Sequence, residues 1–149
     1  MTRRSVLAMA AGASLSAKAA PLRFGFSLYG MKSIPIRSAL DLCAQIGYKA
    51  VELALMPGWD TEPKLLLKAG RGELRKKLKD LDLTLPALME NLKLLGPEAE
   101  QRANLERLKA AAGIAHEVSP GPPAVIETIL GGRPSEWDQK KQEIGRAHV

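Results

Sequence analysis

The feature that most constrains the fold of this chain is the regular alternation of strand-like and helix-like segments along its middle. Residues Arg23–Leu28 alternate apolar with small or polar side chains, which is typical of a β-strand. Similar strand patterns start near Ala50, Thr84 and Ala124, at roughly even spacing. Because helical patterns separate these strands, the sequence predicts a βαβαβαβ order and a parallel sheet with right-handed crossovers.

The helices between these strands are predicted from the spacing of apolar residues and from the residues at their ends. Pro35 opens the first helix, in which apolar residues recur at i, i+3, i+4 and i+7 from Ile36, and Gly47 closes it as a left-handed cap. Leucines at positions 74, 78 and 81 mark the second helix. The third helix is predicted to begin at Pro97. Its side chains expected to face the core are Leu105, Leu108 and Ala112.

Two architectures accommodate this order of elements, an open doubly wound sheet and a (β/α)₈ barrel. No Gly-x-Gly-x-x-Gly pattern follows the first strand, which disfavours a dinucleotide-binding Rossmann unit. A barrel of eight units needs about 250 residues, and this chain has 149. The order of elements therefore predicts an α/β fold and leaves both architectures open. In the barrel, residues 20–142 would form the N-terminal half of a TIM barrel, incomplete after about four βα units, and the resemblance described below implies this choice.

The two ends of the chain differ from its middle. Residues 1–19 resemble a twin-arginine export signal, because Arg3 and Arg4 precede a short apolar stretch that ends in a small-x-small cleavage pattern. A generic secretory signal and an uncleaved N-terminal helix are the alternatives. Residues 143–149 resemble the translation of a sequencing adapter, so we expect an artefact there. These patterns predict an exported, periplasmic protein whose gene sequence is interrupted near residue 142.

The bulk composition excludes several classes of protein. The net charge of +6 includes Arg3, Arg4 and Lys18 of the export signal, so the remainder carries +3, which does not favour a nucleic-acid partner. No apolar run reaches the ~20 residues of a transmembrane helix, so stable membrane insertion is not expected. Cys43 is the single cysteine, which rules out a disulfide within the chain and predicts a small core residue.

Three segments of the chain resemble the sugar phosphate isomerase/epimerase family, which belongs to the xylose isomerase-like TIM barrel superfamily. They are residues 24–29, 46–53 and 125–132. The most specific piece is Gly47-Tyr48-Lys49-Ala50-Val51-Glu52-Leu53, a helix end that runs into a strand carrying a glutamate. The resemblance covers roughly residues 22–139.

The resemblance implies a chemistry as well as a fold. Members of the family hold a divalent metal (Mn²⁺, Zn²⁺ or Mg²⁺) at the C-terminal mouth of the barrel and act on a small sugar or sugar phosphate. The metal polarises a carbonyl and a hydroxyl while carboxylates move a proton at the neighbouring carbon. The main metal ligands come from later strands, so no metal ligand and no catalytic residue is assigned in this chain. We expect the chain by itself to be inactive.

Glu52 is the most informative candidate residue of the chain. In its strand, Val51, Leu53 and Leu55 share one face, and Glu52 lies on the other face between two alanines. In a barrel the bulky face packs under the helices, and Glu52 then faces the lumen, where an unpartnered carboxylate is costly. Two interpretations remain open, a substrate-pocket residue by similarity with the family glutamate and a structural carboxylate bonded inside the lumen.

Four further residues are candidates for substrate binding. Tyr29 follows the first strand, and Glu90 and Asn91 follow the third, so all three should lie at the C-terminal mouth where barrel active sites are built. Loop or capping roles are the alternative for these three residues. Glu127 lies within the fourth strand, and the pattern leaves open whether it faces the lumen or the helices.

Two other functions compete with a sugar isomerase or epimerase. A non-catalytic exported sugar-binding barrel predicts a polar lumen without a metal centre. A nuclease resembling endonuclease IV would need a basic groove and a histidine-rich metal cluster, and the chain has only two histidines.

Overall fold

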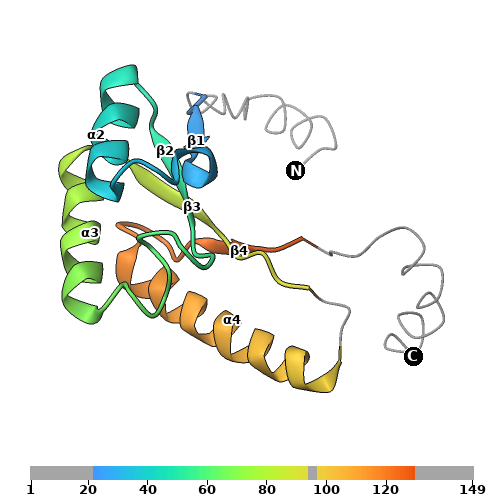
Figure 1. Ribbon diagram of the computed structural model, residues 1–149. Coiled ribbons are helices and arrows are strands. Elements are labelled where there is room, and N and C mark those ends of the chain that lie inside the picture. The colour runs from blue at the N-terminus through green and yellow to red at the C-terminus, as the bar shows by residue number, and fades with distance from the viewer. Residues whose placement is uncertain (1–21, 94–96, 130–149) are drawn as a thin grey trace, which may run out of the picture.

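Strands and helices alternate through the part of the chain that the computed structural model describes, residues 22–93 and 97–129 (Figure 1). In chain order the elements are β1 (Gly25–Ser27), the 3₁₀ helix η1 (Leu28–Met31), α2 (Ile36–Ile46), β2 (Ala50–Ala54), α3 (Lys68–Asp80), β3 (Thr84–Met89), α4 (Glu98–Val118) and β4 (Val125–Glu127). The predicted βαβαβαβ order is confirmed. The expected export signal and the adapter-like tail lie outside the described residues.

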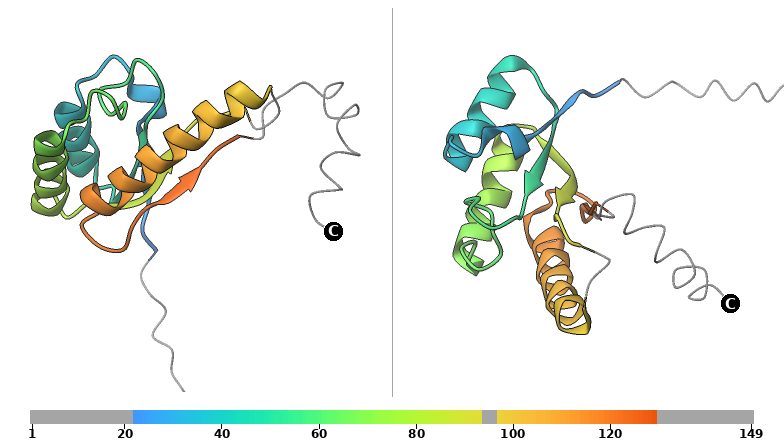
Figure 2. Two further views of the ribbon diagram at one scale, coloured as in Figure 1. Left: turned by 90° about the horizontal axis from the view of Figure 1, so that it is seen from below. Right: turned by 45° about the vertical axis from the view of Figure 1, so that its right-hand side comes forward.

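The strands form one parallel sheet in the sequential order β1-β2-β3-β4. Among the described strands the order never reverses, so they contain no switch point of the kind that defines a doubly wound sheet. Right-handed crossovers in sequential order place every connecting helix on the same face of the sheet. Figures 1 and 2 show α2, α3 and α4 together on that face.

The hydrophobic core lies between the sheet and these helices. Val51, Leu53 and Leu55 are fully buried there, as the alternation in the second strand predicts. They pack with residues from all the described α-helices, such as Leu40, Leu78 and Ile114. Cys43 of α2 is also fully buried, which confirms its role in the core, and burial raises the pKa of its thiol.

Within residues 22–93 and 97–129 no α-helix covers the opposite face of the sheet, and we call it the open face. Strand register places Ser27, Glu52 and Ala87 in one row across it, because Ser27 pairs with Glu52 and Glu52 pairs with Ala87. The next row toward the carboxyl ends of the strands holds Met89 and Glu127. Parallel neighbours in register point to the same side of a sheet, so these side chains share the open face.

Pro86 explains an irregularity in the pairing of β2 with β3. Ala50 pairs with Thr84, whereas Glu52 pairs with Ala87, so β3 contains one extra residue at this point. A bulge leaves a residue outside the hydrogen-bond ladder, and a proline that lacks an N–H is tolerated there. The strand therefore keeps its predicted bounds, Thr84–Met89, in spite of the proline.

The two longest helical predictions have different outcomes. Gly47 caps α2 with a φ of 102°, and its N–H donates to the carbonyls of Ala44 and Cys43, as predicted. The inward face predicted for α4 is wrong at Leu105, which is 51% exposed. The buried residues of α4 are instead concentrated in its second half, with Ala111, Ile114 and Val118 fully buried.

None of the helices within residues 22–93 and 97–129 is long and apolar enough to cross a membrane.

Candidate functional site

Two of the predicted site residues, Glu52 and Glu127, lie on the open face of the sheet. Glu52 comes from β2 and Glu127 from β4, and β3 lies between them. Glu52 and Glu127 lie in successive rows on the same face of the sheet, and the hydroxyl of Ser27 donates to Oε1 of Glu52. The ambiguity in the facing of Glu127 is therefore resolved, because Glu127 shares the side of the sheet that Glu52 occupies.

The contact between the two carboxyl groups changes the chemistry of Glu127. The hydrogen bond to Glu52 and the repulsion from its charge raise the pKa of Glu127 above the ordinary value of 4.5, with a smaller contribution from burial. Glu127 therefore keeps its proton to a higher pH than an isolated glutamate does.

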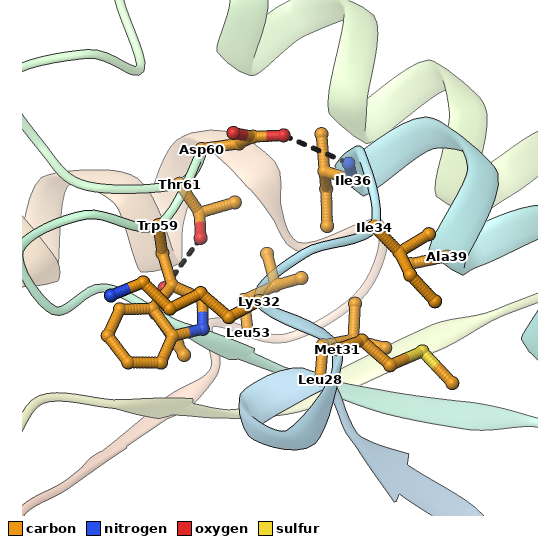
Figure 3. A pocket seen from close by; sticks show the side chains of 11 residues that line it. Leu28, Met31, Lys32, Ile34, Ile36, Ala39, Leu53, Trp59, Asp60 and Thr61 are labelled. Carbon is orange, nitrogen blue, oxygen red and sulfur yellow. Dashed lines mark hydrogen bonds between the residues drawn. The ribbon is translucent and has the colours of Figure 1, made fainter.

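Tyr29 lies beside this pair, at the carboxyl end of β1. Its backbone N–H donates to the Ser27 hydroxyl at 3.3 Å, so Ser27 both caps η1 and contacts Glu52. The Tyr29 ring stacks on Trp59 with a centroid distance of 5.6 Å and an interplanar angle of 19°. Lys32 places its Nζ 4.3 Å from the centroid of the Trp59 ring (Figure 3). The loop after β2 thus holds the Tyr29 ring in place.

The same loop is anchored to the sheet and to α2. The Thr61 hydroxyl donates to the carbonyl of Ala54, and the Asp60 carboxylate accepts from the backbone N–H of Ile36 at 3.1 Å (Figure 3). Asp60 thereby supplies an acceptor at the first turn of α2, where backbone donors have no partner within the helix. These contacts fix the height of Trp59 above the carboxyl ends of β1 and β2.

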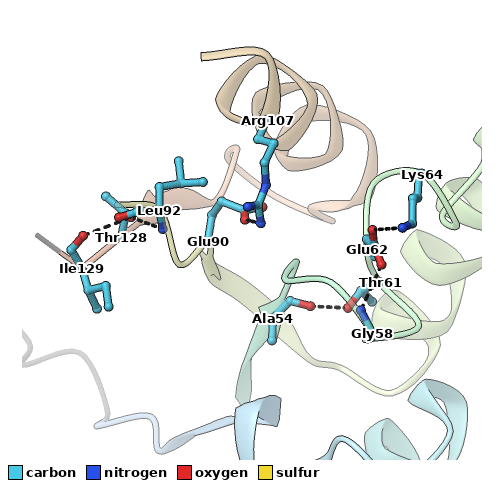
Figure 4. A network of polar contacts seen from close by, with 10 residues as sticks. All are labelled: Ala54, Gly58, Thr61, Glu62, Lys64, Glu90, Leu92, Arg107, Thr128 and Ile129. Carbon is cyan, nitrogen blue, oxygen red and sulfur yellow. Dashed lines mark hydrogen bonds and ion pairs between the residues drawn. The ribbon is translucent and has the colours of Figure 1, made fainter. Parts of the chain in front are cut away.

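Glu90 lies apart from this group, on the helix side of the sheet. Its side chain is 0% exposed and forms an ion pair with Arg107 of α4, while Oε2 has no hydrogen-bond partner (Figure 4). Burial raises the pKa of Glu90, and the nearby Arg107 opposes part of that shift. The sequence offered a substrate-binding role and a loop or capping role for Glu90, and its position in the structure is instead that of a buried carboxylate that ties β3 to α4.

A groove lies next to this ion pair, between the loop after β2 and α4. Its volume is about 480 Å³, and its walls include Glu62, Lys64 and Arg107. Glu62 accepts from the N–H of Gly58 at 2.9 Å and pairs with Lys64 at 2.8 Å, and both contacts lower the pKa of Glu62 (Figure 4). Charges of both signs line the groove, so its walls do not favour a ligand of one charge.

The last predicted residue, Asn91, is exposed in the loop after β3. Glu52 and Glu127 therefore share the open face of the sheet, and Tyr29 is linked to Glu52 through Ser27. Glu90 lies on the other side of the sheet. Sequence reasoning missed Ser27, although its position opposite Glu52 follows from pairing the first two strands at their starts. No sequence pattern indicated a role for Arg107 or Trp59, because each contacts a segment that is distant in the chain.

The open face carries oxygen donors that are relevant to the expected divalent metal. Carboxylate and hydroxyl oxygens are donors that suit Mg²⁺ and Mn²⁺, and Glu52, Glu127 and Ser27 supply them. The residues that the structure describes contain no group of three or more histidine, cysteine, aspartate or glutamate side chains placed to hold a metal ion. Any further ligands would have to come from other residues.

Comparisons with protein-family models and with curated proteins find no match for this chain.

Proposed function

We propose that this chain forms the first four βα units of an exported (β/α)₈ barrel of the sugar phosphate isomerase/epimerase family. The observation that carries the proposal is the placement of Glu52 and Glu127 on the same, open face of the sheet. In the described part of the chain, the sequential parallel sheet has its helices on one face, which is the arrangement of a barrel wall, and its open face would then line the lumen. The substrate of the complete protein is a small sugar or sugar phosphate.

The carboxyl pair suits the proton transfer that such a reaction requires. Isomerisation or epimerisation removes a proton from the carbon next to a carbonyl, leaving the electron pair in an enediol, and then returns a proton to carbon. Glu127 has a raised pKa and can hold that proton, while Glu52, fixed by Ser27, can accept it or bind a sugar hydroxyl. A divalent metal, held in part by these carboxylates, would polarise the carbonyl.

Tyr29 has a supporting role in this proposal. Its ring is 51% exposed and is backed by Trp59, so one face can pack against the apolar side of a sugar. The link from the Tyr29 N–H through the Ser27 hydroxyl to Glu52 keeps the ring and the carboxylate at a fixed spacing. Glu90 takes no part in the proposed chemistry, because it lies on the helix side of the sheet.

The test is an isomerase and epimerase assay with Mn²⁺ or Mg²⁺ on a panel of small aldoses, ketoses and their phosphates. It compares the 149-residue chain with the longest product of its uninterrupted reading frame. We expect no turnover by the shorter chain and turnover by the longer product. Glu52→Gln and Glu127→Gln should each lower kcat of that product at least tenfold, whereas Glu98→Gln should not.

Each other outcome separates the competing functions. Binding of a sugar without turnover or bound metal would favour the non-catalytic sugar-binding barrel. Cleavage of DNA at abasic sites would favour the nuclease. A longer product that binds no sugar and no metal would overturn the proposed function.

A further inference from the structure

The indole of Trp59 carries a buried polar group that lacks a hydrogen-bond partner. Its Nε1–H is shielded from solvent and has no acceptor among the residues that the structure describes. Tyr29 stacks on the ring, and Nζ of Lys32 lies 4.3 Å from the ring centroid. A buried donor that gives up its bond to water without gaining another is costly, so nearly all such donors bind protein or ordered water.

A small cavity adjoins this ring, between η1, α2 and the loop after β2 (Figure 3). Its volume is about 20 Å³. A single water molecule needs about 10–15 Å³, so the cavity has room for one water and for little else. Part of its lining is apolar, with Leu28, Ile34 and Leu53, while Trp59 and Thr61 contribute polar groups.

The polar groups around the cavity determine which small molecule suits it. Thr61 is 3% exposed and its hydroxyl donates to the carbonyl of Ala54, so the hydroxyl oxygen keeps the capacity to accept a hydrogen bond. The indole N–H of Trp59 can only donate. The site therefore needs a molecule that accepts from Trp59 and donates to Thr61, and a water molecule does both.

Ions of either sign suit this cavity less well than a neutral molecule. Asp60 lines the cavity, and its carboxylate would repel an anion that accepts from the indole N–H. Lys32 lines the cavity as well, and its charge disfavours a cation. A neutral molecule with one acceptor and one donor satisfies Trp59 and Thr61 without burying a charge.

We propose that this cavity binds one water molecule, which accepts a hydrogen bond from Nε1–H of Trp59 and donates one to Oγ1 of Thr61. Because Thr61 is bonded to the end of β2, the water connects the Trp59 ring to the sheet. The ring that supports Tyr29 is then held by its edge as well as by stacking. This water site is independent of the proposed sugar chemistry, since neither Glu52 nor Glu127 lines the cavity.

The test measures magnetisation transfer between water and the Trp59 indole proton in the ¹⁵N-labelled 149-residue chain, by NOESY and ROESY. The chain has two tryptophans, so Trp137→Phe leaves a single indole signal, which belongs to Trp59. We expect a cross-peak whose signs in the two spectra are opposite, as a long-lived bound water gives. Equal signs would show direct exchange of the indole proton with solvent, and no cross-peak would show a dry cavity. Either result overturns the proposal.

A second measurement tests Thr61 as the other partner of the water. Oxygen-17 relaxation dispersion counts long-lived waters and does not respond to hydroxyl protons. Thr61→Val removes the hydroxyl at nearly constant volume, so the count should fall by one relative to the parent chain. Thr61→Ser keeps the hydroxyl and should keep the parent count. An equal count in Thr61→Val and the parent would overturn the assignment of this partner.

The matched control is Thr84→Val. The Thr84 hydroxyl also donates to a backbone carbonyl, that of Lys49 at 2.9 Å, but Thr84 is exposed and does not line the cavity. This variant should leave the count of long-lived waters unchanged. Circular dichroism shows whether Thr61→Val is folded, and if it is not, the NOESY and ROESY comparison still decides the proposal, because it needs no change at Thr61.

Discussion

At the scale of single residues, the pair of Glu52 and Glu127 makes a prediction about pH. The charge of Glu52 raises the pKa of Glu127, so Glu52→Gln should return that pKa toward its ordinary value of 4.5. Carbon-detected NMR titration of the side-chain carboxyl groups measures this shift. Glu98→Gln, which alters an exposed glutamate paired with Arg102, should leave Glu127 unchanged. A Glu127 pKa that is the same in both variants would refute the contact.

The sign of the stability effect follows from the same shift. Because the folded state holds the Glu127 proton more tightly than the unfolded state, stability falls as pH rises from 4.5 through the raised pKa. In Glu52→Gln this fall should be smaller.

The buried ion pair of Glu90 and Arg107 makes a second prediction at this scale. Arg107→Met leaves Glu90 without its partner, and we expect a loss of about 2 kcal/mol in the free energy of unfolding. The loss stays below that of a fully buried pair because Arg107 is partly exposed and Glu90 can take up a proton. Arg102→Met, which breaks an exposed pair, should cost less than about 0.5 kcal/mol. Urea unfolding of both variants at neutral pH measures the difference.

The dependence of stability on pH provides a second measurement on the same ion pair. The pKa of Glu90 is already raised, and removing Arg107 raises it further, so Arg107→Met should lose more stability than the parent as pH increases above 4.5. Equal losses at pH 5 and pH 8 would contradict the assignment of a buried carboxylate.

At the scale of elements, two glycines provide a matched pair of substitutions. Gly47 ends α2 with a φ of 102°, so Gly47→Ala should destabilise the chain by about 1–2 kcal/mol. Gly72 lies inside α3, and an added Cβ there meets nothing within 4 Å. Gly72→Ala should therefore stabilise it by about 0.5–1 kcal/mol. Thermal unfolding of the two variants should give midpoint shifts of opposite sign, and shifts of the same sign would refute the cap.

The elements also show which local signals suffice to predict structure. The strand Ala50–Ala54 and the helix Ile36–Ile46 were predictable because apolar spacing, a proline start and a glycine stop all agree. The inward face of α4 was not, because alanines occupy several of its positions and give little contrast between faces. The buried face of α4 is determined by its packing against α3 and β4. These tertiary contacts cannot be inferred from the spacing of residues along the helix.

At the scale of the whole molecule, the parallel sheet and its order could be predicted, while most contacts of the candidate site could not. Glu52 faces the open side because of strand alternation, a local rule. Glu127 reaches Glu52 only because β3 lies between them in register. Glu90 departs from the expectation of a mouth residue because the strand alternation past Leu88 turns it toward Arg107. Such pairings depend on tertiary geometry rather than on spacing in the chain.

The last prediction concerns how stability is distributed across the sheet. β2 and β3 have neighbours on both sides, so the amides of Leu53 and Leu88 should exchange with solvent most slowly. The carbonyl of Glu127 accepts from the N–H of Glu90 at 2.9 Å, so Glu127 bonds toward β3. Neighbouring residues of a parallel strand bond to opposite sides, and the amide of Ile126 therefore points to the free edge.

Hydrogen exchange at the Ile126 amide thus reports on the outer edge of β4. We expect this amide to exchange at least tenfold faster than the amide of Leu88, because β3 has a neighbour on both sides and β4 has one neighbour among the described strands. The amide of Leu53 in β2 is the matched control and should exchange as slowly as that of Leu88. Equal protection at Ile126 and Leu88 would contradict an open edge at β4.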